Sequence, residues 1–285
     1  MKNKTLWIAV GGLVLAAVCL LAYAIRPQAA AVATNGSIDE MRKIVKAHMQ
    51  KAGSDTKAGE RPRRAGKGRG LQRALFDHLP AEERKLCEAL QEAVDADNLE
   101  KTLQAVAKMV SCTNAEVRAH AVDALGWFGA SALPELTLLM GDRDEDVAQS
   151  AINAWEVSVM EIDDAGTRLK VSEMALQAIS NKDALQFIGS QFSIAATELI
   201  DGAEDEDAAS DRRVKVVQSV VDMIDSPNAQ LSEVGRGLYE EITGNEWLGV
   251  EEAEKYLADP DNYEPPSETA GEGAEAKDGK SGTET

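Results

Sequence analysis

Three side chains, Glu116, His120 and Asp123, have the types and spacing that could bind a metal ion or exchange protons. In a helix they would share one face, because positions three and four apart are neighbours. The same composition is typical of an ordinary solvated polar face. The other two histidines, His48 and His78, lie in separate segments. We therefore predict a solvated face here and no metal site.

Asp142-x-Asp144-x-Asp146 resembles the start of a calcium-binding loop. Such a loop requires Gly at its sixth position and a bidentate Glu at its twelfth, where this chain has Val147 and Asn153. Asp and Asn are also common residues in turns and at helix starts. These carboxylates therefore predict a turn and a helix cap.

The remaining chemistry-bearing residues give no catalytic pattern. The acidic segment 201–207 could bind cations loosely, but no nucleophile elbow, phosphate loop or dinucleotide fingerprint is present. Cys19 lies in an apolar run, and a helical hairpin turning near Ala96 would place Cys112 nearer Pro80 than Cys87. We expect two free thiols outside the apolar run, with a Cys87–Cys112 bridge as the alternative. The chain is thus predicted to be no enzyme and to need no cofactor.

Charge divides the chain into unlike parts. Residues 41–73 carry eleven Lys and Arg against two Asp and Glu, whereas residues 74–285 carry sixteen against forty-five. An acidic body repels phosphates, so we expect no nucleic-acid ligand. A protein partner, including one with a basic segment, remains compatible with this charge.

Residues 6–25 (LWIAVGGLVLAAVCLLAYAI) form an uncharged apolar run long enough to cross a bilayer. The run predicts a single transmembrane anchor within residues 1–30, in contact with the lipid bilayer. Lys2 and Lys4 favour a cytoplasmic N-terminus with the rest of the chain on the outer side. Ala22-Tyr23-Ala24 would fit cleavage of a signal peptide, and secretion of the remainder is the alternative.

Residues 31–73 are predicted to be a basic flexible linker containing one short amphipathic helix. Apolar residues at Ile38, Met41, Ile44, Val45 and Met49 would lie on one side of that helix. Residues 50–70 lack this pattern and are rich in Gly, Pro and charge. Their basic side chains are interpreted as solvated, or alternatively as docked on anionic lipid or on the acidic body.

From residue 71 onward, apolar residues recur at helical spacing between short polar joints. Two segments, 114–127 and 144–157, align without a gap at an offset of thirty residues. Their shared apolar positions would form one buried stripe with room for close helix packing. The stripe positions are Val117, Ala121, Ala124 and Leu125, then Val147, Ala151, Ala154 and Trp155.

Each of these segments is the second helix of a predicted hairpin. The first helices are expected at 99–110, 133–140, 170–179 and 214–224, and the second at 114–127, 144–157, 184–199 and 231–242. We expect a Thr113-x-x-Glu116 capping box and Pro227 in a first helical turn. Residues 80–94, and Trp247-Leu248 with 251–257, would cover the two ends.

These residues resemble HEAT repeats, in particular the short repeats of phycobilisome-lyase-like proteins. Carrying the resemblance are Val117-Arg118, the run from Ala121 to Gly126, Leu133-Pro134 and the Asp-rich turn after them. The resemblance implies a protein-binding scaffold whose second helices line the concave side, and it implies no activity. We therefore expect an all-α fold, in which a transmembrane helix precedes a right-handed α-solenoid of about four hairpins at residues 74–258. Residues 259–285 are expected to form a disordered acidic tail.

The helical phase also predicts which side chains face outward. The expected outward stripe, a candidate protein-binding surface, consists of Glu116, His120, Asp123 and Trp127, then Asp146, Ser150, Asn153 and Val157. An exposed Trp among polar groups is a typical anchor for a partner, but packing against the next repeat is the favoured interpretation of Trp127. A membrane-anchored adaptor that binds another protein is the favoured function. The alternatives are a lyase-like or chaperone subunit that handles a cofactor, and a structural spacer of the cell envelope.

Overall fold

The computed structural model describes residues 36–51 and 76–266. Within these two ranges the chain forms helices and no strand, which confirms the all-α prediction. Amphipathic helices joined by short turns are what the apolar spacing of the sequence dictates. No described helix combines the length and apolar character needed to cross a membrane. The 6–25 run lies outside the described residues.

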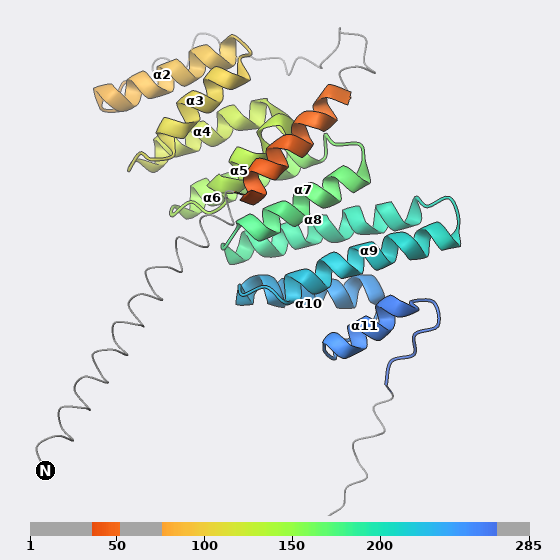
Figure 1. Ribbon diagram of the computed structural model, residues 1–285. Helices are drawn as coiled ribbons and strands as arrows, with labels where there is room; N and C mark the ends of the chain where they lie inside the picture. Colours follow the sequence, from red (N-terminus) through yellow and green to blue (C-terminus); the bar gives the residue numbers. More distant parts are fainter. Residues whose placement is uncertain (1–35, 52–75, 267–285) are drawn as a thin grey trace, which may run out of the picture.

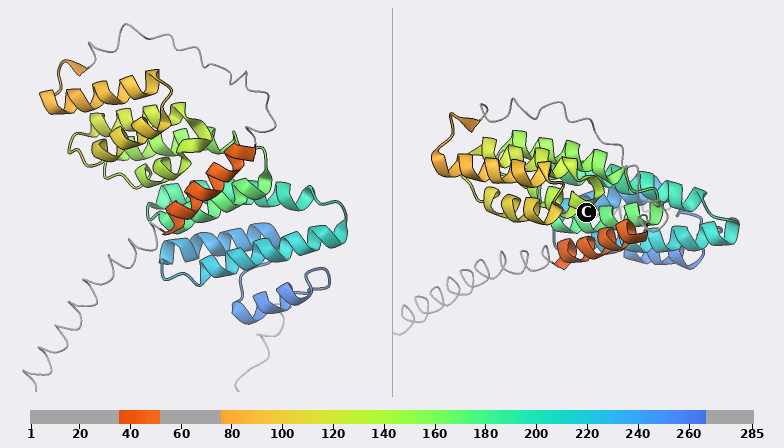
Figure 2. Two further views of the ribbon diagram at one scale, coloured as in Figure 1. Left: turned by 45° about the horizontal axis from the view of Figure 1, so that its top comes forward. Right: turned by 90° about the horizontal axis from the view of Figure 1, so that it is seen from above.

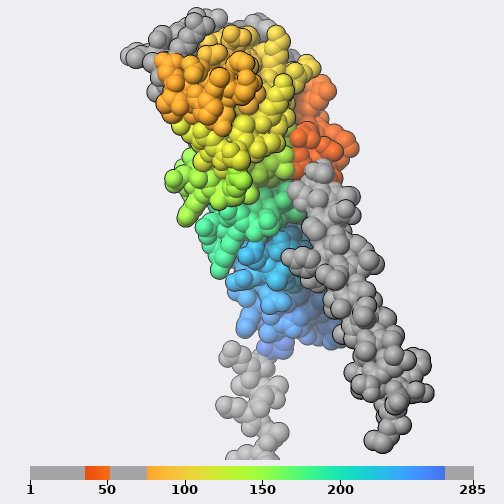
Figure 3. Space-filling model, turned by 90° about the vertical axis from the view of Figure 1, so that its left-hand side faces the viewer, coloured from red at the N-terminus to blue at the C-terminus, as the bar shows by residue number. Residues whose placement is uncertain are grey.

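The helices pack in the order in which they occur in the chain. Figures 1 and 3 show this order running along the long axis, from α2 at one end to α11 at the other. The elements are α2 (Ala81–Asp95), α3 (Leu99–Met109), α4 (Ala115–Trp127), η2 (Gly129–Ala132), α5 (Leu133–Leu139), α6 (Glu145–Val159), α7 (Ala165–Ala178), α8 (Lys182–Asp201), α9 (Glu206–Ile224), α10 (Ala229–Thr243) and α11 (Val250–Ala258).

Successive helices form hairpins, and the hairpins stack. The pairs α3 with α4, α5 with α6, α7 with α8 and α9 with α10 are in contact, and so are the second helices α4 with α6 and α8 with α10. The rings of Trp155 on α6 and Phe187 on α8 meet edge to face, with centroids 6.3 Å apart. The stack is therefore continuous through these second helices.

Side-chain caps explain where the helices begin. Seven helices start after an Asn or Asp whose side chain accepts a backbone N–H of the first turn, which pairs a donor that would otherwise have no helical partner. These residues are Asn98, Asn114, Asp144, Asp164, Asn181, Asp205 and Asn228. Two expectations were wrong. Asn114, not Thr113, caps α4, and Pro227 lies before the cap of α10 rather than in its first turn.

The shared alanine stripe is buried as the thirty-residue alignment predicts. Ala121 and Ala151 have no exposed surface, and their apolar companions on the stripe are buried or half-buried. A Cβ added to Gly126 of α4 would lie 3.7 Å from the Cβ of Ala154, so the two helices approach closely. Small residues allow this approach.

Aromatic side chains cover the C-terminal end of the stack. Tyr239 on α10 meets Trp247 edge to face at 5.1 Å and Tyr256 of α11 at 6.2 Å, and Tyr256 meets Tyr263 at 5.5 Å. Burial raises the pKa of Tyr239 to about 12, with the neighbouring Tyr263, Tyr256 and Glu252 adding to the shift. Leu248, expected in the same cover, is instead 50% exposed.

The segment at 36–51 is also helical, and it packs against the stack. Figures 1 and 2 show this 36–51 helix on one side of the stack, beside α7 and far from α2, the next described helix in the sequence. Its side chains Ile38, Met41 and Val45 are 2%, 0% and 3% exposed. The apolar side that the sequence predicts is therefore buried against the protein.

Candidate protein-binding surfaces

The outward stripe lies on α4 and α6, with most of its side chains in solvent. Trp127 is 42% exposed and Val157 is 49% exposed, at equivalent positions one repeat apart. The polar members Glu116, Asp123, Asp146, Ser150 and Asn153 are exposed as well. Each exposed apolar residue follows a polar one, Asp123 or Asn153, by one helical turn on the same side. This alternation gives the surface apolar contacts within a polar border.

His120 departs from the expected outward position. Its ring packs edge to face against Phe76, with centroids 4.8 Å apart, and its side chain is 26% exposed. The Nδ1 atom is 4.0 Å from a carboxylate oxygen of Asp123. Glu116 is paired elsewhere, with Nε2 of His78 at 2.8 Å. The three residues therefore do not converge on one point, and the described residues contain no group of His, Cys, Asp and Glu arranged to bind a metal ion.

The Asp-rich turn before α6 has structural roles. Asp144 caps α6, as turn chemistry predicts. Asp142 accepts two hydrogen bonds from Arg118, from Nε at 2.7 Å and Nη2 at 2.8 Å. Burial opposes ionisation of Asp142, but these bonds, the N–H of Asp144 and the charges of Arg118 and Arg143 outweigh it and hold the pKa below its usual value. The carboxylate is therefore engaged in holding the turn.

Cys87 and Cys112 are both free thiols, so the alternative of a bridge is not realised. Burial raises the pKa of Cys87 to about 11, and nearby acidic groups add to the shift. A thiol with so high a pKa is a poor nucleophile at neutral pH. Cys87 therefore behaves as a small core side chain.

A second surface is formed by the first helices of the hairpins. The 36–51 helix lies over α5 and α7, antiparallel to α7. Ser37 donates a hydrogen bond to Gln177 near the end of α7 (3.3 Å). At the other end lies Asp164, the cap of α7. Its pKa is lowered by the Thr167 hydroxyl against the effect of burial, and further by the charges of His48 and Lys51.

Contacts with α5 fix the 36–51 helix in place. Met41 Sδ lies 3.7 Å from the hydroxyl of Thr137, which also accepts a hydrogen bond from Nε1 of the buried Trp155 at 3.0 Å. Arg42 donates to Glu135 Oε1 at 3.0 Å. Burial raises the pKa of Glu135, and the hydrogen bond and charge of Arg42 oppose that rise. Arg42 therefore helps to stabilise a carboxylate that burial disfavours.

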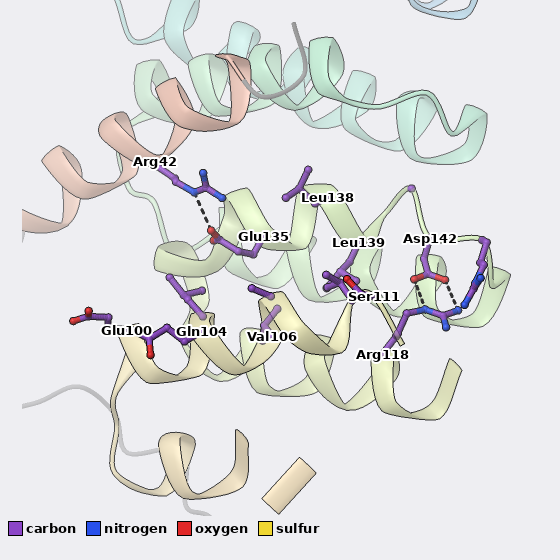
Figure 4. Close-up of a pocket in the computed structure, with 15 residues that line it drawn as sticks. Arg42, Glu100, Gln104, Val106, Ser111, Arg118, Glu135, Leu138, Leu139 and Asp142 are labelled. Atoms are coloured by element: carbon purple, nitrogen blue, oxygen red, sulfur yellow. Dashed lines mark hydrogen bonds and ion pairs between the residues drawn. The ribbon is translucent and has the colours of Figure 1, made fainter. Parts of the chain in front are cut away.

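Beside the 36–51 helix is an open groove of about 870 Å³ between α3 and α5. Figure 4 shows Arg42 and Glu135 at one part of this open groove and Arg118 with Asp142 at the other. The apolar lining consists of Leu103, Val106, Ala107 and Val110 from the α3 side and Leu138 and Leu139 from α5. Val110 is 40% exposed and Leu138 is 45% exposed. The lining residues do not include any member of the outward stripe.

The sequence of α3 contains a second apolar face, which indicates a contact surface such as the open groove. Leu103 and Ala107 of α3 and Val110 just after it have the spacing i, i+4, i+7 of an apolar face, while Ala105 and Met109 are buried and Val106 lies between the two sets. Two apolar faces on one helix indicate a second contact surface. Which helix lies opposite the second face becomes known only from the packing.

Comparison with known proteins adds no assignment. A scan of protein-family models gives no match to the chain, and neither do searches of curated proteins and of solved structures. The functional argument therefore depends on the geometry described above.

Proposed function

We propose that this chain is a membrane-anchored scaffold that binds another protein through an acidic, HEAT-like α-solenoid, and that it is not an enzyme. Supporting the solenoid are the stacked hairpins and the equivalent buried positions of α4 and α6 at an offset of thirty residues. Repeated helical hairpins present extended surfaces that suit protein partners.

One observation carries the binding role: Trp127 and Val157 occupy equivalent positions on neighbouring second helices, and both are exposed. Other residues of the same helices, those of the buried stripe, make the contacts with neighbouring helices, so Trp127 and Val157 are not needed for that packing. Aromatic and aliphatic side chains left in solvent within a polar border are typical of a binding surface. The acidic excess of residues 74–285 favours a partner with a basic segment.

The anchor in this proposal is the apolar run 6–25, with the N-terminus cytoplasmic and the helical stack on the outer side. Ten residues, 26–35, separate that run from the 36–51 helix. Ten residues reach at most about 35 Å even when fully extended. Because the 36–51 helix packs on the stack, the scaffold would be held close to the bilayer instead of ranging freely on a long linker.

Affinity purification of the tagged full chain from solubilised membranes tests the proposal. We expect a stoichiometric protein partner with the unchanged chain, and its loss with the double substitution Trp127→Ala and Val157→Asp. Leu248→Ala is the matched control, because Leu248 is equally exposed but lies near the other end of the stack. A bound chromophore or metal would support the lyase-like alternative, and recovery with nothing bound would support the spacer.

A further inference from the structure

Two neighbouring grooves lie between the first helices of the hairpins, and one of them is covered while the other is open. The groove over α5 and α7 is covered by the 36–51 helix, whose Ile38, Met41 and Val45 are almost completely buried. The open groove between α3 and α5 is lined by apolar side chains, two of them 40% and 45% exposed. Arg42 belongs to both, because it lies on the docked helix and also lines the open groove. The two sites are therefore contiguous.

The structure of the groove walls favours a helical occupant. The backbone N–H and C=O groups of α3 and α5 are already paired within their helices, so an extended peptide would gain no backbone hydrogen bonds there. An amphipathic helix satisfies its own backbone and needs only an apolar wall, which the open groove supplies. The neighbouring groove is occupied in this way by residues of the same chain.

We propose that the open groove is a docking site for an amphipathic helix of another protein, one with apolar residues spaced like Ile38, Met41 and Val45 and with a basic flank. The basic flank is inferred from Glu100, which lines the groove, and from the acidic excess of the body, since Glu135 is already paired with Arg42. This site rests on the proposed protein-binding role of the stack, but it uses a different face from the outward stripe.

A peptide with the sequence of residues 36–51 is a suitable probe, because the covered groove shows that this sequence binds such a wall as a helix. The full chain is placed in phosphatidylcholine nanodiscs, and binding of the labelled peptide is followed by fluorescence anisotropy, with empty nanodiscs as the blank. We expect saturable binding that Leu138→Asp and Val110→Asp each weaken by roughly tenfold or more. Ile194→Asp, at an apolar residue of α8 that is 46% exposed and does not line the groove, should leave binding unchanged.

Several outcomes would overturn this docking site. One is the absence of saturable binding to the unchanged chain. Another is that the Leu138→Asp and Val110→Asp variants bind the peptide as tightly as the unchanged chain does. That result would mean that the peptide binds elsewhere or displaces the chain's own helix. A third is that a peptide carrying Met41→Asp binds as tightly as the unchanged peptide, which would show that the groove does not recognise the apolar spacing. Circular dichroism confirms that each variant is folded.

Failure of this site and failure of the proposed function can be told apart. Purification from membranes tests whether any partner exists and does not depend on the peptide. If a partner is retained by Leu138→Asp but lost with the double substitution in the outward stripe, the scaffold role stands. Peptide binding that is insensitive to Leu138→Asp and Val110→Asp rejects the groove even in that case.

Discussion

Arg118 on α4 forms a two-bonded ion pair with Asp142 in the turn after α5, and their side chains are only 2% and 7% exposed. The same guanidinium donates through Nη1 to the backbone carbonyls of Cys112 (2.8 Å) and Thr113 (3.0 Å). One side chain therefore fixes the turn between α3 and α4 to the turn between α5 and α6. Both turns border the open groove.

Replacing Arg118 with Met should lower the free energy of unfolding by about 3–5 kcal/mol, because Asp142 would remain buried without its partner. Urea denaturation of a fragment covering residues 36–266 provides the measurement. Arg143→Ala is the control. Arg143 donates to the same two carbonyls but is exposed, so its loss should cost at most about 1 kcal/mol. Equal effects would show that the buried pair contributes no more than the exposed contacts.

Acid should weaken the fold partly through Asp142. Its pKa is lowered in the folded protein, so the unfolded chain binds the proton more readily and unfolding becomes easier as the pH falls. This contribution is complete above an unfolded pKa of about 4 and is lost as the pH falls through the lower folded value. Denaturation midpoints of the 36–266 fragment between acid and neutral pH should therefore change less with pH in an Asp142→Asn variant. An unchanged slope would contradict the role of this carboxylate.

The helices could be predicted from sequence because their apolar residues repeat at helical spacing and their starts carry Asn or Asp. Even so, Thr113 and Asn114 are adjacent and both can cap, and only the backbone geometry shows that Asn114 does so. His120 illustrates another limit. Its position on the helix predicts an outward direction, but Phe76, which precedes α2, packs against its ring.

The candidate sites differ in how far sequence could predict them. Phase alone places Trp127 and Val157 outside, because each lies opposite the buried stripe of its own helix. The spacing of Met41 and its neighbours predicts an apolar side but not the surface that covers it. Recognising the open groove requires the relative placement of α3, α5 and Arg42, which are distant in sequence. Such information resides in tertiary packing and not in any local pattern.

Enlarging the alanine stripe should destabilise the stack at both aligned positions. Ala121 and Ala151 are fully buried against neighbouring helices, so a Leu at either one should cost about 1–3 kcal/mol through overpacking. Asp123→Ala and Asn153→Ala, on the exposed side, should change stability by less than about 0.5 kcal/mol. Urea melts of the four variants compare the two faces directly. Similar losses at both faces would contradict the equivalence of the two helices.

The two described cysteines should differ in reactivity. Cys87 is 1% exposed and its pKa is raised to about 11, whereas Cys112 is partly exposed in the turn after α3. Because the thiolate is the reactive form, iodoacetamide at neutral pH should modify Cys112 first and Cys87 only after unfolding. Peptide mass spectrometry after timed labelling measures both. Early labelling of Cys87 would mean that α2 opens readily.

Docking of the 36–51 helix should depend on Met41. This side chain is fully buried and reaches Thr137 of α5, so Met41→Ala should remove about 2 kcal/mol of docking free energy. That loss corresponds to roughly thirtyfold faster hydrogen exchange of the backbone amides in the helix, provided that exchange proceeds through undocking. Exchange measured by mass spectrometry on the 36–266 fragment reports this segment separately from the rest of the stack.

Lys43→Ala is the matched control for the same helix. Lys43 pairs with Glu40 at 2.9 Å on the exposed side of the helix and contributes nothing to the buried face, so amide exchange should stay close to that of the unchanged fragment. If Met41→Ala speeds exchange throughout α5 and α7 as well, the helix stabilises the stack as a whole. If exchange of residues 36–51 is already fast in the unchanged fragment, the helix is not firmly docked. Without firm docking, more than residues 26–35 would separate the predicted anchor from the scaffold, and the scaffold would not be held close to the bilayer.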